Sequence, residues 1–299
     1  MTIDVTNTVK LLAKSTDETE GTFLLVAINK DGNWREYVIP ATKLLDMKGI
    51  RGELVHRGHP LTDDHAYWQS VKESLYGNTD KRFRLITCPG WSGYSYISAD
   101  DQLLGRLREG EIKPRFNPDY QVVSHADSSV KSDEFREAIT PILRSSSRIM
   151  LAACTAYSGY LAPFTEVKTS GFHFYGDSSI GKTTTLSIAA SIQLGVEGIA
   201  SWDMTEKGFE EAAETHNHNV LILDELKLLD GDPRAAADKA SKLVYMLAEQ
   251  GGKRRSTKYE TSRASWKLSI LSAGERSLTE HAQDGRRMHM AGERVRLID

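Results

Sequence analysis

Gly176-Asp177-Ser178-Ser179-Ile180-Gly181-Lys182-Thr183 matches the phosphate-loop (Walker A) pattern GxxxxGK[ST], and it decides the fold of this chain. An apolar stretch, residues 172–175, precedes it, and a helical stretch, residues 181–193, follows it. That strand–loop–helix context lets backbone N–H groups and the helix N-terminus point at phosphate oxygens. We therefore expect residues 176–184, Thr184 included, to bind the phosphates of ATP. The alternative is a Gly/Ser turn that binds nothing.

Within this loop, two side chains have predicted chemical roles. Lys182 would reach the β- and γ-phosphates, and the Thr183 hydroxyl would hold Mg²⁺. ATP and Mg²⁺ are therefore the expected cofactors.

A second motif is Val220-Leu221-Ile222-Leu223-Asp224-Glu225, an apolar run that ends in two acids, as a Walker B motif does. A continuous apolar run is typical of a strand in a parallel sheet, and ligands of such sheets bind at the carboxyl ends of the strands. Asp224 would hold the magnesium ion, and Glu225 would polarise the attacking water. The alternative is a strand that ends at a charged turn.

Strand and helix patterns alternate from residue 170 onward, which predicts an α/β fold with a parallel sheet flanked by helices. One strand separates the two motifs along the chain, which favours the additional-strand class of P-loop NTPases. Glu225 beside Asp224 favours hydrolysis of ATP to ADP and phosphate. Ser272 follows a strand predicted over residues 266–271, where a polar residue could sense the γ-phosphate; capping of the next turn is the alternative.

The chain is expected to have three parts. Residues 1–20 are a polar, flexible N-terminus, residues 21–125 a small α+β module, and residues 126–299 the ATPase domain. In the module, Trp68, Val71 and Leu75 share one face of a helix predicted over residues 64–76.

The net charge and the composition of the chain exclude some classes of protein. The net charge of −3 excludes a globally basic nucleic-acid binder, so DNA contact must come from a local patch such as Lys253, Arg254 and Arg255. The chain has no apolar run of about 18 residues and no secretory signal, which predicts a cytoplasmic protein without a membrane partner.

These motifs resemble the P-loop ATPase domain of a poorly named bacterial family found in prophages, plasmids and chromosomal cassettes. Relatives of that family include MCM-like replicative helicases of the AAA+ class. The resemblance starts from residues 171–184 and extends over most of the chain, through Gly90-Trp91, Phe135, Leu223-Asp224-Glu225, residues 245–248 and 252–255, Trp266, and residues 271–275 and 295–297.

The resemblance implies a ring-forming motor, a hexamer in the full-length protein, that acts as a replicative DNA helicase of a mobile genetic element. Single-stranded or forked DNA would bind a basic hairpin at Lys253, Arg254 and Arg255, for which a solvated loop is the alternative. A loader or assembly switch for another replication protein, without helicase activity, is the alternative function.

Arg296 resembles the arginine that MCM-like subunits insert into the neighbouring ATP site, with Arg276, Arg287 and Arg294 as rivals. Family members continue into a helical lid, whereas this sequence stops at Asp299. A lid contact to ATP is therefore expected to be absent.

Overall fold

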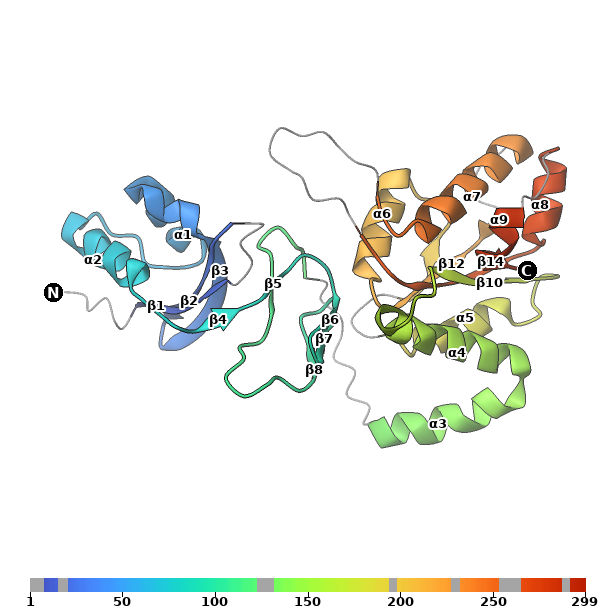
Figure 1. Ribbon diagram of the computed structural model, residues 1–299, viewed down its shortest axis with the longest axis horizontal. Coiled ribbons are helices and arrows are strands. Elements are labelled where there is room, and N and C mark those ends of the chain that lie inside the picture. Colours follow the sequence, from blue (N-terminus) through green and yellow to red (C-terminus); the bar gives the residue numbers. More distant parts are fainter. Residues whose placement is uncertain are drawn as a thin grey trace. The chain divides into compact units, whose positions relative to one another are not determined.

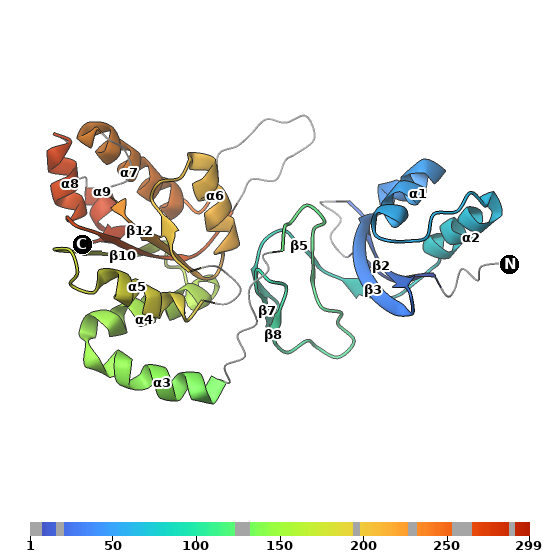
Figure 2. The ribbon, with the colours of Figure 1, turned by 180° about the vertical axis from the view of Figure 1, so that it is seen from behind.

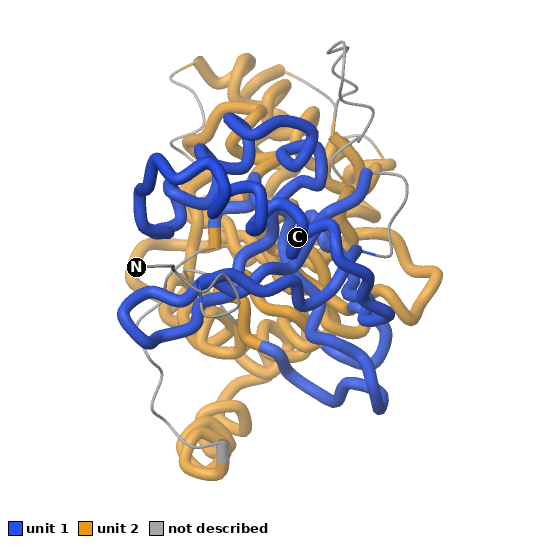
Figure 3. The backbone as a smooth tube through the Cα atoms, turned by 90° about the vertical axis from the view of Figure 1, so that its left-hand side faces the viewer, with its two compact units in different colours: residues 1–87, 92–95, 103–121 blue, residues 88–91, 96–102, 122–299 orange. Residues whose placement is uncertain are grey.

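The computed structural model describes residues 8–15, 21–122, 132–193, 198–226, 232–252, 265–286 and 291–299. The chain divides into two compact units, drawn blue and orange in Figure 3. The first comprises residues 1–87, 92–95 and 103–121, and the second comprises residues 88–91, 96–102 and 122–299. Two short segments that precede residue 125 thus belong to the second unit, and the domain bounds of the sequence analysis stay a prediction.

The first unit is built on a four-stranded sheet of order β3-β2-β1-β4. Its strands are β1 (Val9–Ser15), β2 (Phe23–Lys30), β3 (Asn33–Pro40) and β4 (Arg82–Phe83). β2 and β3 form an antiparallel hairpin, and its turn places Asp31 and Gly32 at positive φ. An Asp-Gly turn of this kind matches the twist of the flanking strands.

Two helices pack on one face of that sheet: α1 (Met47–His56) and α2 (His65–Tyr76), preceded by the short 3₁₀ helix η2 (Ala41–Leu45). Trp68, Val71 and Leu75 of α2 are fully buried, which confirms the predicted apolar face. Asp64 caps α2 through the backbone N–H of Tyr67. Helix α1 was not predicted from the sequence.

Short strands follow α2. They are β5 (Leu85–Ile86), β6 (Gly90–Ser92), β7 (Ser95–Ile97), β8 (Leu103–Gly105) and β9 (Arg115–Phe116). β5 pairs with β9 in parallel, and β6, β7 and β8 form a separate three-stranded sheet.

The second unit contains a five-stranded sheet whose pairs are all parallel, in the order β11-β12-β13-β10-β14. Its strands are β10 (Ser170–Tyr175), β11 (Ala200–Ser201), β12 (Val220–Asp224), β13 (Ser269–Gly274) and β14 (Leu297–Ile298). The predicted mixed α/β fold with a parallel sheet is confirmed. β13 lies between β10, which leads into the phosphate loop, and β12, which ends in Asp224.

Helices cover both faces of this sheet, as the opposite views of Figures 1 and 2 show. One face carries α3 (Ser132–Ser145), α4 (Ser147–Leu161), with the 3₁₀ turn η3 (Ala162–Phe164), and α5 (Lys182–Ala190). The other carries α6 (Glu206–Thr215), α7 (Pro233–Ala248), α8 (Leu278–Asp284) and α9 (Ala291–Arg294). Val220 and Ile222 of β12 belong to the core on the α4–α5 side, and Leu221 and Leu223 to the core on the α6–α7 side. Burial on both faces explains the continuous apolar sequence of β12.

The strand predicted over residues 266–271 is displaced in the structure. β13 runs from Ser269 to Gly274, because its last three residues continue the parallel ladder opposite residues 173–175 of β10. The amides of Lys267 and Leu268 bond instead to the side chains of Asn217 and Thr169. Ser, Ala and Gly have weak strand propensity, which is why the sequence pattern ended the strand too early.

None of the helices in the described ranges combines the length and the apolar character that a membrane crossing requires.

Candidate functional site

The phosphate-loop motif forms a tight turn between β10 and α5. Gly176, Ser179 and Gly181 all have positive φ, at 142°, 65° and 92°. Alternation of left- and right-handed conformations turns successive N–H groups toward one concavity, and such concavities bind anions. Gly181 is the N-cap of α5 and offers no side-chain cap to the first turn, so a bound anion can satisfy those amides. The geometry fits a phosphate group.

The ammonium of Lys182 is turned back onto the loop. Its Nζ donates hydrogen bonds of 2.7 Å to the carbonyl oxygens of both Gly176 and Asp177. Phosphate oxygens carry more negative charge than these carbonyls, so they would compete for the same ammonium donors. Ile180, at the tip of the loop, has 62% of its surface exposed.

The residues predicted to hold magnesium lie in direct contact. The Thr183 hydroxyl donates a hydrogen bond of 2.9 Å to Oδ2 of Asp224. Oδ1 of Asp224 accepts the backbone N–H of Glu225 at 2.8 Å, which orients the carboxylate. Mg²⁺ prefers one or two protein oxygen ligands together with waters and substrate phosphates, so a hydroxyl beside a carboxylate fits this ion. Among the described residues, no group of three or more His, Cys, Asp or Glu side chains is arranged to hold a metal ion.

Glu225 lies just past the end of β12 in a strained conformation. Its φ is 63°, a region that non-glycine residues adopt at a cost of about 1–3 kcal/mol. Its side chain is exposed to solvent at the same carboxyl edge of the sheet as the phosphate loop. Such strain is common at functional sites, where it aims a side chain that a regular strand would point elsewhere.

Ser272 lies inside β13 rather than beyond its end. Its side chain is fully buried and takes part in two hydrogen bonds of 2.9 Å, with Trp202 Nε1 and with His173 Nδ1. No role for His173 or Trp202 was predicted from the sequence. The available signal was a histidine between Phe172 and Phe174 in a buried strand, since a buried polar side chain needs partners.

Arg296 is far from the phosphate loop of its own chain. Its carbonyl accepts the backbone N–H of Gly171, at the amino end of β10, whereas the loop follows the carboxyl end of that strand. Its guanidinium carbon lies 4.6 Å from the ring centroid of Tyr245 on α7, and Nη1 donates to the Gly292 carbonyl. The structure therefore does not bring Arg296 together with the other predicted site residues within one chain.

The predicted DNA-binding residues Lys253, Arg254 and Arg255 lie outside the described residues. On either side of the segment, Gly251 and Ser265 form an antiparallel bridge, and Trp266 N–H donates to the Gln250 carbonyl. Gly251 and Ser265, the described residues that flank the segment, are therefore neighbours.

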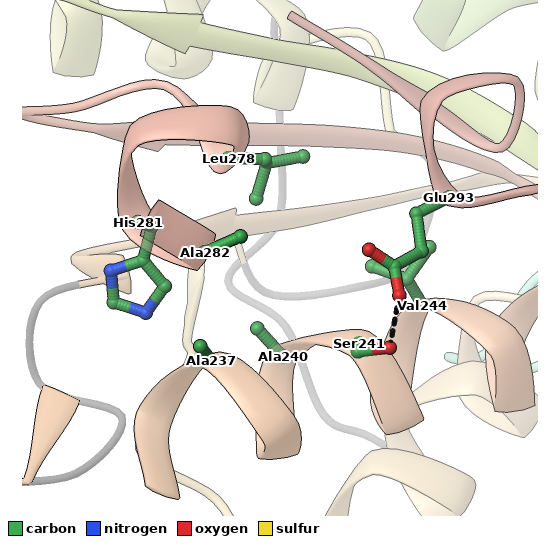
Figure 4. A pocket seen from close by; sticks show the side chains of 8 residues that line it. All are labelled: Ala237, Ala240, Ser241, Val244, Leu278, His281, Ala282 and Glu293. Carbon is green, nitrogen blue, oxygen red and sulfur yellow. Dashed lines mark hydrogen bonds between the residues drawn. The ribbon is translucent and has the colours of Figure 1, made fainter. Parts of the chain in front are cut away.

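A small cavity of about 20 Å³ between α7 and α8 is shown in Figure 4. Alanine side chains form much of its lining, and Ser241 bonds to the buried Glu293 at its edge. The cavity has room for about one water molecule and none for a nucleotide.

Residues 88–91 pack within the second unit against the turn that precedes β12. The backbone N–H of Trp91 donates to Nδ1 of His218, and Trp91 Nε1 donates to the Tyr160 carbonyl. Gly90 has a φ of 129°, and a Cβ atom there would lie 2.4 Å from His218 Nδ1. Burial and the nearby Lys267 lower the pKa of His218 to about 4, which keeps Nδ1 an acceptor near neutral pH.

A solved structure described as "SCCmec type IV Cch - active helicase" has a similar fold, with a TM-score of 0.69 and 20% sequence identity. The similarity covers 97% of this chain and 54% of that one, so this chain spans about half the length of that helicase. At this identity the likeness is one of fold. No curated protein matches this chain.

One family model matches residues 2–267, a range that contains the phosphate loop and Asp224 and ends before β13. That match covers most of the sequence. The chain therefore belongs to the family described as "Domain of unknown function (DUF927)".

Proposed function

We propose that this chain is an ATP-hydrolysing motor domain of the AAA+, additional-strand class, and that it serves as a DNA helicase of a mobile genetic element. The observation that carries the proposal is the contact between Thr183 and Asp224. It lies beside a loop whose geometry fits a phosphate group and which leads into a helix without a side-chain N-cap. The position of β13 between β10 and β12 supports the additional-strand class. The likeness in fold to a protein titled an active helicase supports the motor role.

In the proposed reaction, the loop amides and the N-terminus of α5 bind the β- and γ-phosphates. Lys182 exchanges the Gly176 and Asp177 carbonyls for phosphate oxygens. Thr183 and Asp224 would hold Mg²⁺, directly or through water, and the ion would supply positive charge that offsets the negative charge of those phosphates. Glu225 orients and polarises the water that attacks the γ-phosphate, and the products are ADP and phosphate.

Completion of the site in trans is part of the proposal. Arg296 lies at the opposite edge of its own sheet, so it can stabilise transition-state charge only in a neighbouring subunit of a ring. Lys253, Arg254 and Arg255 would contact the phosphates of single-stranded or forked DNA without reading its sequence.

ATP hydrolysis by the purified chain tests the proposal, with Lys182→Ala and Glu225→Gln as variants. We expect Lys182→Ala to abolish ATP binding, and Glu225→Gln to retain binding while losing hydrolysis by about 100-fold or more. A Lys182→Ala protein that hydrolyses ATP at the wild-type rate contradicts the proposal.

The helicase role needs two further measurements. Single-stranded DNA should stimulate hydrolysis, and replacement of Lys253, Arg254 and Arg255 by Gln should remove that stimulation while basal hydrolysis stays. Lys207→Gln on the exposed face of α6, which removes one surface cation outside this segment, is the control for position. ATP-dependent separation of a forked duplex supports a helicase, whereas hydrolysis without strand separation identifies a loader or assembly switch.

A further inference from the structure

A buried chain of hydrogen bonds links three strands of the sheet beneath the candidate nucleotide site. It connects Trp202, which follows β11, with Ser272 of β13 and His173 of β10. Their side chains are exposed by 0%, 0% and 2%. His173 and Ser272 are direct partners in the β10–β13 ladder, so the side-chain bond runs alongside backbone pairing.

The direction of each bond follows from chemistry. His173 Nε2 lies 3.0 Å from the carbonyl oxygen of Arg276, and a carbonyl only accepts, so Nε2 carries the proton. In a neutral ring Nδ1 is then an acceptor, and the Ser272 hydroxyl donates to it. Ser272 Oγ in turn accepts from Trp202 Nε1–H. Burial lowers the pKa of His173, which agrees with a neutral ring.

The last hydrogen bond of this series, from His173 to the Arg276 carbonyl, reaches the segment in the middle of the candidate site. In the parallel ladders, Gly274 is level with Tyr175, which precedes the phosphate loop. A Cβ atom on Gly274 would lie 3.1 Å from the His173 ring and 3.4 Å from Leu226, which follows Glu225. Residues 274–276 therefore leave the sheet between the phosphate loop and Glu225.

Arg276 carries the positive charge of this segment. Its guanidinium is paired with Asp284 of α8 and its side chain is 61% exposed, so an incoming anion can reach it. Its backbone, by contrast, is held by the His173 imidazole.

We infer that His173 is a positioning residue that fixes residues 274–276, and with them Arg276, against the terminal phosphate of a nucleoside triphosphate in the same chain. The inference rests on the proposed function, because it presumes that a nucleotide binds the phosphate loop. In the proposed site the terminal phosphate would lie between Lys182 and the water that Glu225 orients, and residues 274–276 border that space. The series of hydrogen bonds from Trp202 to Arg276 then distinguishes ATP from ADP, because only ATP carries the phosphate that residues 274–276 contact.

Two matched variants test the hydrogen bonds of the two imidazole nitrogens of His173 separately. His173→Gln keeps an N–H donor near the position of Nε2, and His173→Asn keeps a polar atom near that of Nδ1 but loses the donor to Arg276. We expect His173→Asn to lower kcat by about tenfold with KM for ATP little changed, as the loss of one buried hydrogen bond implies. We expect His173→Gln to stay within about threefold of wild type.

A measurement on the unaltered protein covers the case in which the variants do not fold. The protein has 5 tryptophans, and the indole N–H resonance of Trp202 is assigned by through-bond correlation to the backbone resonances of Trp202. Mg²⁺ with ATPγS should shift this resonance, and Mg²⁺ with ADP should leave it near its nucleotide-free position.

Equal losses in both His173 variants, or an indole resonance that ignores bound ATPγS, overturn the positioning role and leave the proposed function standing. A wild-type protein that binds neither nucleotide refutes the proposed function and the positioning role together.

Discussion

Thr183 and Asp224 are 41 residues apart in sequence, yet the hydroxyl of the first donates a 2.9 Å hydrogen bond to the carboxylate of the second. Thr183 lies in the first turn of α5, and Asp224 is the last residue of β12. Strand β10, which leads to Thr183, does not pair with β12, since β13 lies between them. The contact between Thr183 and Asp224 therefore depends on the carboxyl ends of β10, β13 and β12 being assembled into one site.

Replacement of Thr183 by valine keeps the shape of the side chain and removes its oxygen. We expect ATP hydrolysis to fall by about tenfold or more, because a magnesium ligand and the bond to Asp224 are both lost. A magnesium titration of the hydrolysis rate should show a raised half-saturation concentration. Ser191→Ala at the C-cap of α5 is the control. An unchanged magnesium dependence in Thr183→Val would argue against this ligand assignment.

Glycine at position 225 should separate stability from activity. Glycine adopts a φ of 63° without steric cost, so Glu225→Gly should raise the free energy of unfolding by about 1 kcal/mol or less. The same change removes the group that we propose polarises the attacking water, so hydrolysis should be lost. Thermal denaturation and single-turnover hydrolysis check the two effects. Glu225→Gln, which keeps the strain, is the matched control, and a glycine variant less stable than it contradicts the strain argument.

Arg296 should act only between subunits. Mixing Lys182→Ala protein with Arg296→Ala protein, each inactive alone, should restore hydrolysis, since some interfaces then combine an intact loop with an intact arginine. Sizing with and without ATP shows whether the mixed assembly forms. Assemblies that form without any recovery of hydrolysis would point to Arg287 or Arg294 as the arginine that acts in trans.

Tyr245 makes a related prediction, because the Arg296 guanidinium lies over its ring. Tyr245→Leu removes the cation–π contact, whose strength is about 0.5–2 kcal/mol, and frees the arginine. We expect a small loss of stability and hydrolysis at or above the wild-type rate in the assembled protein. A loss of hydrolysis as large as that of Arg296→Ala would mean that Tyr245 orients the arginine rather than restrains it.

Stability should fall between neutral pH and pH 4 because of two histidines, His216, which is buried, and His218, which is half-buried. The folded pKa values of His216 and His218 are both lowered to about 4 by burial, from an ordinary value of 6.5. Between these values the unfolded chain binds protons that the folded chain does not, so their stabilisation is complete above pH 6.5 and is lost as the pH falls toward 4. Each histidine contributes at most about 1.4 kcal/mol per pH unit in that window.

Melting temperatures at pH 7.5 and pH 5 measure this effect. His218→Asn is the matched variant, because asparagine tolerates the φ of 55° at this position and its oxygen can accept the Trp91 N–H. The variant should lose less stability on acidification than wild type. Equal losses in the two proteins would exclude His218 as a source of the pH dependence.

Much of the fold could be read from local patterns. The apolar runs before Gly176 and Asp224, and the helical periods after them, predict β10, α5 and β12, because phosphate loops and buried parallel strands impose their patterns on neighbouring residues. The pattern failed at β13, where small residues extend the strand, and at α1, whose sequence carries a weak apolar stripe. In the candidate site, motif spacing identified Lys182, Thr183, Asp224 and Glu225 but not His173.

The sequence by itself determined that a loop with the phosphate-loop motif and a strand that ends in two acids exist, because each is a contiguous motif whose backbone geometry follows from its own residues. Only the tertiary structure decided that β13 lies between them, that Ser272 is buried against His173 and Trp202, and that Arg296 lies at the opposite edge from the loop. Those relationships depend on the order and register of strands that are distant in sequence, and register is set by packing across the whole sheet rather than by any local pattern.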